Sequence, residues 1–544
     1  MDRRNALKTL GLATVGAAVG AAVAAHFTDA DATIGLLGGV PASGSQPGFL
    51  PAGHWVAAVS TMSVIYPRPD TETSSFARHR WAYYDGTHSV QYRIPIGVRG
   101  GAAPYVFKLL QGPAGMSIES EYWVPGDTAA QMLSAGYGDV IWTPSASVTG
   151  ATVQVQVTGQ DGASVTVEWT VSTSSSTSQF VFVDPVNGVD ANTGTILAPI
   201  KTFTKLLSGF AGATAYLRTG THAAVSSMTL SSSTPAALIN FPGESPIIDI
   251  TGSSSTYCFG FTGNEIDNFF QGFSFTGTAT ANTAQYEYFW PGQQAFRWTQ
   301  HLISFPSVFA GLNAANNSTG TYFSDFGASA GQFSQYIYCK GCSETNRVTA
   351  SGQSYGLMAM YCTQYGLAEF NSVTNSSAVQ NLYLKASNRN WTRRYNNLQM
   401  TNSSSALASG DQINTAGESQ DDEVCYNLLV NAWTGTPTLL FNENQQSNAI
   451  TTGYSYRNTI VGTGGAGGDI TNGPFSFNYD AIQYGSAPQA ILFYTTGWVG
   501  GTLPSNMTDS NTQCQASSGV LDGSYNLTGS YKTSWYGQRG WEIA

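Results

Sequence analysis

Charged side chains are scarce in this chain, where Asp, Glu, Lys and Arg together make up only 10% of the 544 residues. The formal net charge is −11, so the chain lacks the basic surface that general nucleic-acid binding requires. Aromatic residues make up 12%, whereas disordered chains combine few aromatics with a high net charge. The composition is therefore that of a folded protein that does not bind nucleic acid.

Cysteine is also rare. Six cysteines are too few for a fold built on disulfides: Cys258, Cys339, Cys342, Cys362, Cys425 and Cys514. Cys339 and Cys342 have the spacing of a redox or zinc half-site, but no second pair and no nearby histidine completes a metal set. We expect a local disulfide at a turn or plain buried thiols. The motifs Gly-x-Ser-x-Gly and His-Glu-x-x-His are absent, and residues 464–468 lack the Lys and Ser/Thr of a phosphate-binding loop.

Long apolar runs are missing except at the N-terminus. The run from Leu10 to Ala25 is short for a spanning helix, which needs about 20 apolar residues. It follows Arg3-Arg4, and residues 2–8 resemble the twin-arginine export motif. We therefore expect residues 1–25 to be an export signal, with no membrane span in the mature chain and a periplasmic, secreted or cell-surface location. An uncleaved membrane anchor is the alternative.

The 60 glycines, with many Ser, Thr and Asn, indicate numerous turns and a β-rich protein, and the length predicts two or more domains. Residues 26–55 have the composition of a linker. Within residues 56–171, Val153, Val155 and Val157 alternate with polar residues and begin a predicted hairpin. This segment resembles the immunoglobulin-like (cadherin-like) β-sandwich modules of bacterial surface proteins. The Ser/Thr run 172–178 predicts a flexible linker before an independently folded second part.

The second part opens with residues 180–194, which read FVFVDPVNGVDANTG, followed by Pro-Ile-Lys-Thr-Phe at 199–203. This entry resembles that of right-handed parallel β-helix proteins of the pectate-lyase-like superfamily. The resemblance implies an all-β solenoid over residues 179–544, in which each coil contributes three short strands.

Two internal alignments test this expectation. The first places Tyr338, Tyr361 and Tyr383 in one column, at spacings of 23 and 22 residues. The second places Asn371, Asn396, Asn427 and Asn458 in one column, at spacings of 25, 31 and 31 residues. Side chains repeated once per coil stack about 4.8 Å apart, and asparagine bonds its own kind along such a stack. We expect this asparagine column to be structural, with asparagine tolerating the left-handed turn conformation.

Charge is concentrated at one place. Lys385, Arg389, Arg393 and Arg394 fall within ten positions, and an acidic run follows at Glu418, Asp421, Asp422 and Glu423. The alignments place Arg394 above Glu369, where an ion pair is the simplest expectation, and place Lys385 in the column of Thr363 and Lys340. We expect the two patches on adjacent coils facing one groove, with Lys385 more exposed than Arg394.

The resemblance implies that the protein binds or cleaves a polysaccharide as a monomer. In an uronic-acid lyase of this kind, Lys385 or Arg394 would be the base, Arg389 and Arg393 would hold the sugar carboxylate, and Lys340 and Asp411 would bind substrate. The acids Glu418, Asp421 and Asp422 fit three roles: Ca²⁺ ligands, suggested by the superfamily, paired carboxylates of a glycoside hydrolase, or partners of the cations. The remaining alternative is a non-catalytic surface or glycan-binding protein.

Overall fold

The computed structural model describes residues 57–123 apart from Ser74, residues 133–224, and most strands with some of their connecting turns between residues 228 and 516. The predicted export signal, the predicted linker at 26–55, Asp411, Glu418 and Asp421 lie outside the described residues. The described structure is nearly all β, as predicted. Its helices are short: η1 (Asp70–Glu72), η2 (Arg78–Arg80) and α3 (Phe203–Leu207), whose first turn is capped by Thr202.

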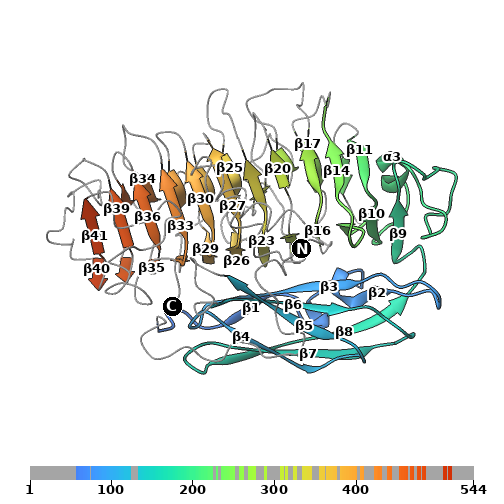
Figure 1. The fold of residues 1–544 in the computed structure, drawn as a ribbon, viewed down its shortest axis with the longest axis horizontal. Helices are drawn as coiled ribbons and strands as arrows, with labels where there is room; N and C mark the ends of the chain where they lie inside the picture. The colour runs from blue at the N-terminus through green and yellow to red at the C-terminus, as the bar shows by residue number, and fades with distance from the viewer. Residues whose placement is uncertain are drawn as a thin grey trace, which may run out of the picture.

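Two four-stranded sheets form the N-terminal part (Figure 1). The first has the order β1 (Ser63–Tyr66), β3 (Tyr92–Arg99), β6 (Leu133–Trp142) and β5 (Ser117–Trp123), and the second β2 (Trp81–Tyr83), β8 (Ser164–Ser174), β7 (Ala151–Thr158) and β4 (Val106–Gln111). The predicted hairpin is confirmed, since β7 pairs with β8 in antiparallel register and its three valines are buried. We call these two sheets the sandwich. Strand β8 continues through Ser174, so it includes the first residues of the predicted linker.

Three long sheets of parallel strands follow, visited in turn by the chain, which is the arrangement of a parallel β-helix (Figure 1). The 13-stranded sheet contains β9 (Phe180–Val183), β10 (Thr214–Leu217), β13 (Ala237–Asn240), β16 (Asn268–Gln271), β19 (Ser307–Ala310), β22 (Ser334–Gln335), β23 (Ile337–Lys340), β26 (Thr363–Glu369), β29 (Arg389–Arg394), β32 (Asp422–Cys425), β35 (Gly453–Tyr456), β38 (Phe475–Asn478) and β40 (Met507–Ser510).

The 11-stranded sheet contains β11 (Gly220–Ala223), β14 (Pro246–Asp249), β17 (Ser274–Thr276), β20 (Asn313–Ala315), β24 (Ser343–Thr345), β27 (Ser372–Ser376), β30 (Asn397–Met400), β33 (Leu428–Asn431), β36 (Thr459–Gly462), β39 (Ala481–Tyr484) and β41 (Gln513–Ala516). The seven-stranded sheet contains β12 (Met228–Leu230), β15 (Tyr257–Phe261), β18 (Glu287–Trp290), β21 (Phe323–Phe326), β25 (Tyr355–Tyr361), β28 (Gln380–Ala386) and β31 (Ser405–Ser409). Strands β34 (Thr438–Glu443) and β37 (Ala466–Ile470) form a separate pair.

The asparagine column is confirmed. The side-chain amides of Asn371, Asn396 and Asn427 each donate to the side-chain oxygen of the next asparagine at 2.9 Å, and Asn458 ends the described ladder. Each amide also donates to a backbone carbonyl at 2.9 to 3.1 Å. The same side-chain oxygens accept the backbone N–H of the preceding asparagine, so these buried polar groups are satisfied inside the coil.

The left-handed residue at this corner is the aromatic residue before the asparagine, and not the asparagine as predicted. Phe370, Tyr395 and Tyr426 have φ values of 54° to 58°. Their rings stack at 5.0 and 5.1 Å between centroids. A left-handed conformation costs a non-glycine residue about 1 to 2 kcal/mol. The ladder on one side and the ring stack on the other hold the corner in this conformation.

The prediction of a tyrosine column is wrong. Tyr338 lies in the 13-stranded sheet, where it pairs with Leu367, whereas Tyr361 and Tyr383 lie in the seven-stranded sheet. Within that sheet Tyr383 is opposite Ala359, not Tyr361. Each coil contains three similar strands, so a spacing of 22 to 23 residues matched strands on different faces.

The sandwich lies along the 13-stranded sheet (Figure 1). One continuous cluster of buried side chains includes Ile96 and Tyr105 of the sandwich together with Tyr338 and Leu367 of the sheet. Gly97 approaches so closely that a Cβ at this position would lie 2.8 Å from the ring of Tyr338. Because one buried apolar cluster spans both parts, we expect them to unfold together instead of as independent units.

The asparagine ladder yields a stability prediction. Asn396→Ala removes the middle rung, which leaves the backbone N–H and one side-chain N–H of Asn371 without their acceptor and the carbonyl of Ala368 without its donor. Buried groups left unsatisfied cost about 1 to 3 kcal/mol each, so we expect the free energy of unfolding in denaturant to fall by about 2 to 5 kcal/mol. Gln399→Ala, which removes a half-buried amide of the same coil, should change it by less than about 1 kcal/mol. Equal losses in the two variants would show that the ladder is not a special source of stability.

Candidate functional site

The four clustered cations do not form one patch. Arg389, Arg393 and Arg394 lie on β29 of the 13-stranded sheet, whereas Lys385 lies on β28 of the seven-stranded sheet. The side chain of Lys385 is outside the described residues, so its exposure relative to Arg394 stays a prediction. The predicted column of Lys385, Thr363 and Lys340 is wrong. Thr363 and Lys340 lie in the 13-stranded sheet, where Thr363 is opposite Ser334 and Lys340 is opposite Glu369.

Arg394 is directly opposite Glu369, as predicted. Its Nε donates to Glu369 Oε2 at 2.7 Å, and the side chain is only 2% exposed. The guanidinium also donates to the Tyr105 hydroxyl at 2.6 Å and to the Val98 carbonyl at 2.7 Å, both in the sandwich. Burial lowers the pKa of Arg394, but Glu369 and its other neighbours raise it more, so the group stays protonated. A permanently charged, covered arginine does not serve as a base, and these contacts give Arg394 a structural role.

Arg393 points the opposite way, as alternate residues of a strand do. It is fully buried in the coil, where it donates to the Leu382 carbonyl at 2.9 Å and forms an ion pair with Asp422. The basic and acidic patches are thus on adjacent coils, because β29 pairs with β32. They meet through a buried ion pair, and not across an open groove.

Lys340 is also buried and reaches across to the sandwich. Its Nζ lies 2.5 Å from Asp139 Oδ1, and Arg93 lies 2.6 Å from Asp139 Oδ2. Burial raises the pKa of Asp139, but the charges of Lys340 and Arg93 outweigh it and hold that pKa below its usual value. This carboxylate is therefore ionised and binds the sheet to the sandwich.

Glu423 of the acidic run is held by hydroxyl groups. Ser60 and Thr392 each donate to Oε2 at 3.1 Å, and the Tyr456 hydroxyl donates to Oε1. Ser60 precedes the first strand of the sandwich, so this acid too belongs to the contact between the two parts.

Arg389, the remaining cation of the cluster, lies at the start of β29, and its side chain is half-buried.

The cysteines in the described part are consistent with buried thiols. Cys339, Cys342 and Cys425 are buried and form no disulfide with one another. Burial and the neighbouring Cys342 raise the pKa of the Cys339 thiol, which makes it unreactive. Among the described residues, no group of three or more His, Cys, Asp or Glu side chains could hold a metal ion. No helix in the same part of the chain has the length and apolar character to cross a membrane.

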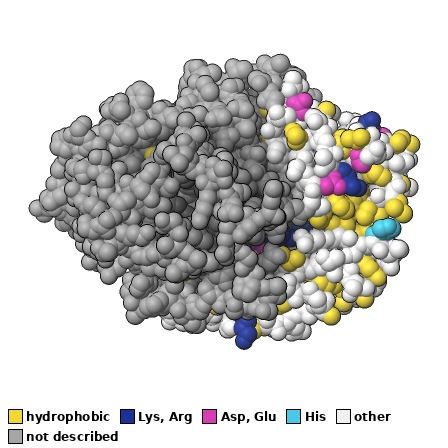
Figure 2. Space-filling model, in the orientation of Figure 1, with side chains coloured by type: hydrophobic (Ala, Val, Ile, Leu, Met, Phe, Trp, Pro, Cys, Tyr) yellow, Lys and Arg dark blue, Asp and Glu magenta, His cyan; other side chains and the backbone are white. Residues whose placement is uncertain are grey.

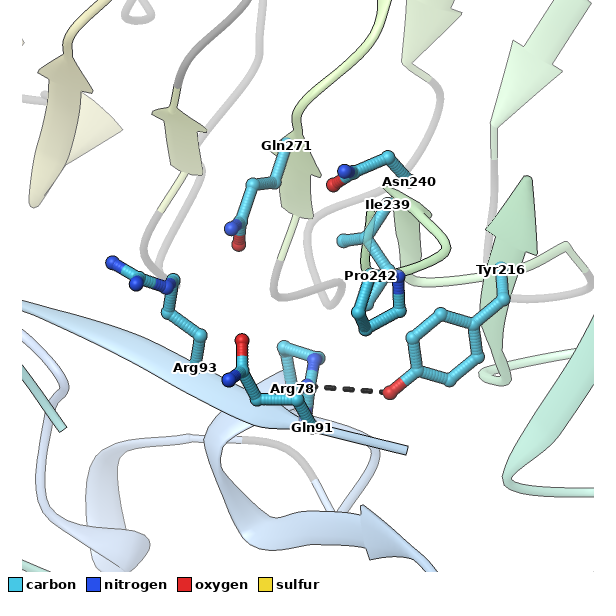
Figure 3. Close-up of a pocket in the computed structure, with 8 residues that line it drawn as sticks. All are labelled: Arg78, Gln91, Arg93, Tyr216, Ile239, Asn240, Pro242 and Gln271. Atoms are coloured by element: carbon cyan, nitrogen blue, oxygen red, sulfur yellow. Dashed lines mark hydrogen bonds between the residues drawn. The ribbon is translucent and has the colours of Figure 1, made fainter. Parts of the chain in front are cut away.

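A pocket opens between the sandwich and the 13-stranded sheet, and we call it the seam pocket (Figure 3). It has an empty volume of about 330 Å³, including its open mouth, and is lined by Arg78, Gln91, Arg93, Tyr216, Ile239, Asn240, Pro242 and Gln271. Sequence reasoning missed this site. The available signal was the short basic run Arg78-His79-Arg80, but its partners come from distant strands. Elsewhere, the described surface in Figure 2 carries few charged side chains among large uncharged areas.

Comparison with known proteins gives little beyond this geometry. No protein-family model and no curated protein sequence matches the chain. Similar solved structures include the GH136 lacto-N-biosidase from Eubacterium ramulus, whose selenomethionine derivative has a TM-score of 0.34 and whose native form has a TM-score of 0.28. Each is 9% identical in sequence, and each match covers 62% of this chain and 68% of that chain. Pectate lyase Pel9A has a TM-score of 0.29 and 12% identity over 61% of this chain and 79% of that chain. Similarities this low carry no argument about activity.

The ion pair of Arg394 and Glu369 can be tested by substitution. Arg394→Ala leaves a buried carboxylate without its cation, so we expect the free energy of unfolding to fall by about 3 to 5 kcal/mol. Arg80→Ala is the control, because its pair with Asp70 is partly exposed and should contribute less than about 1 kcal/mol. Adding Glu369→Gln to Arg394→Ala should recover part of the loss. If Arg394→Ala unfolds like the wild type, the ion pair does not hold the sandwich to the sheet.

His79, next to Arg78, yields a pH prediction. Burial, followed by the charges of Arg80 and Arg78, lowers its pKa from 6.5 to about 3, although Asp70 lies 3.9 Å from the ring. Between these values the unfolded chain binds a proton that the folded protein does not. Stability should therefore fall as the pH decreases from about 6.5 towards 3, by up to about 1.4 kcal/mol per pH unit from this residue.

His79→Gln should remove that component. Because carboxylates also titrate in this range, the quantity to measure is the difference between wild-type and variant unfolding free energies from pH 7 to pH 4. A difference that stays constant with pH would contradict a neutral, buried His79.

Proposed function

We propose that the protein is exported and acts on an acidic polysaccharide, with a right-handed β-helix as its glycan-binding rod and an immunoglobulin-like sandwich as its second module. In this proposal residues 1–25 are a cleaved signal, 56–171 form the sandwich and 179–544 form the β-helix. Solenoids offer long continuous surfaces on which a polymer can lie. The interactions described between the sandwich and the β-helix reach the 13-stranded sheet, so we expect the reacting sugar beside the seven-stranded sheet, which carries Lys385.

The observation that carries the proposal is the position of Lys385. It is separated from the paired arginines and lies in the seven-stranded sheet. The register there is irregular, since Met360 is opposite Leu384 and Tyr361 is opposite Ala386, which leaves position 385 as an extra residue. Bulges are over-represented at sheet edges, at barrel rims and next to active sites, where they redirect a side chain. Lys385 is therefore the best candidate for the base among the four cations.

In the proposed reaction the Lys385 amine removes the proton alpha to the sugar carboxylate. The electron pair left on that carbon forms a double bond as the bond to the leaving glycosidic oxygen breaks, and this oxygen takes up a proton. A cation beside the carboxylate stabilises the intermediate charge. In this proposal Arg389, which is half-buried at the start of β29, takes this role. Arg393 and Arg394 form buried ion pairs with Asp422 and Glu369.

The residues of the acidic run that the structure describes do not fit a Ca²⁺ site. Asp422 is buried and bonded to Arg393, so a second cation would be repelled there. Nor do Asp422 and Glu423 suit a hydrolase pair, because successive strand residues point to opposite faces and cannot flank one glycosidic bond.

A non-catalytic glycan-binding role is the second candidate. It is favoured by the burial of Lys340, Arg393 and Arg394 in ion pairs, since these cations then stabilise the fold and are not available for chemistry. The two candidate functions share an acidic glycan as ligand, and they differ in whether the protein cleaves it.

A screen of polyuronates distinguishes them, because elimination creates an unsaturated uronide that absorbs ultraviolet light. We expect turnover of one acidic glycan by the wild type, and loss of more than about 100-fold in Lys385→Ala, in the range expected for removing a general base. Lys201→Ala, which removes an exposed lysine near β9 at the N-terminal end of the β-helix, should retain full activity. Retained turnover in Lys385→Ala would remove Lys385 from the mechanism, and binding without product would establish the non-catalytic role.

A further inference from the structure

Arg78 is a buried cation with an unusual environment. Its side chain is only 2% exposed, and its described contacts are neutral: Nη1 donates to the Trp81 carbonyl at 2.7 Å, and Nη2 lies 3.5 Å from the Tyr216 hydroxyl. The guanidinium also lies over the Tyr92 ring, 5.1 Å from its centroid. Its Nε has no hydrogen-bond partner among the described residues.

No carboxylate pairs with Arg78 within the described part of the chain. The acid nearest in sequence, Asp70, lies 3.7 Å from Arg80 instead and accepts hydrogen bonds from Thr170. By contrast, three other cations at this seam each have an acid: Asp139 for Arg93 and Lys340, Glu369 for Arg394. Burying a charge without a partner of opposite sign is strongly unfavourable. Arg99 is also buried without a described acid, but it does not line the seam pocket.

The other lining groups of the seam pocket suit an anion. Figure 3 shows Gln91 and Gln271 facing the space between Arg93 and Arg78 from opposite sides, and the Tyr216 hydroxyl directed at Arg78. Amide and hydroxyl groups donate hydrogen bonds to carboxylate oxygens. Asn240 is fixed in the wall because its amide donates to the Glu244 carbonyl at 3.0 Å and because Gly272, with φ of 72°, packs against it.

We propose that the seam pocket binds a carboxylate group, with the Arg78 guanidinium as its charge partner. A guanidinium with two donor faces matches the two oxygens of a carboxylate. The pocket is small, so the remainder of the ligand lies outside its mouth. The carboxylate can belong to a uronic acid of a glycan, which rests on the function proposed above, or to a small free acid. The site is separate from Lys385, so either proposal can fail without the other.

The test is isothermal titration calorimetry of the full chain with sodium galacturonate, sodium acetate and the neutral sugar galactose. Both carboxylates should bind and galactose should not. Affinity for galacturonate more than about tenfold above that for acetate indicates a uronide as the natural ligand, and equal affinities indicate a free acid. Two outcomes overturn the proposal: galactose binds as tightly as galacturonate, or neither galacturonate nor acetate binds.

Arg78→Gln should weaken galacturonate binding at least about tenfold, whereas Arg80→Gln in the same short helix should leave it unchanged. Arg78 also donates a hydrogen bond to the Trp81 carbonyl, so Arg78→Gln can destabilise the fold. A second variant therefore tests the pocket without removing Arg78. Gln271→Glu places a carboxylate among the lining groups, so we expect a higher melting temperature and loss of galacturonate binding. Galacturonate affinity within twofold of wild type in both Arg78→Gln and Gln271→Glu would show that the pocket is not a carboxylate site.

Discussion

The contact between the sandwich and the 13-stranded sheet is the constraint on which the rest of the structure depends. The outward face of this sheet carries Tyr338, Glu369 and Arg394. Water would leave the tyrosine ring exposed, and a purely apolar partner would leave the two charges without polar contacts. The sandwich supplies both kinds of contact, with Gly97 against the tyrosine ring and Tyr105 on the guanidinium. The charges are therefore neutralised within the protein, and the apolar groups are shielded by the same surface.

This arrangement changes the meaning of the charged residues. In a chain with so few charges, a cationic cluster suggests a ligand, yet Lys340, Arg393 and Arg394 are satisfied by acids from neighbouring coils or from the sandwich. The opposite holds for Arg78, which is an unremarkable residue in the sequence but a buried cation without a described acid in the structure. Function is better sought where a charge lacks its partner than where charges are most numerous.

The accuracy of the sequence analysis followed the physics of each pattern. The asparagine column was predictable because a ladder of identical amides works only when one residue recurs at the same corner of each coil. The pairing of Arg394 with Glu369 followed from that register. The tyrosine column failed because Tyr338 and Tyr383 occupy similar short strands in different sheets, and coils of 25 and 31 residues allow several registers.

The sequence by itself determined the β-rich class, the solenoid repeat and the hairpin of the sandwich, because these depend on local alternation and on periodic spacing. Only the tertiary structure decided which charges are buried and where a pocket opens. Tyr105 and Val98 lie 289 and 296 residues from Arg394 along the chain, and the walls of the seam pocket come from both parts of the molecule. Burial and ion pairing depend on how distant surfaces dock, and no local pattern of residues encodes that contact.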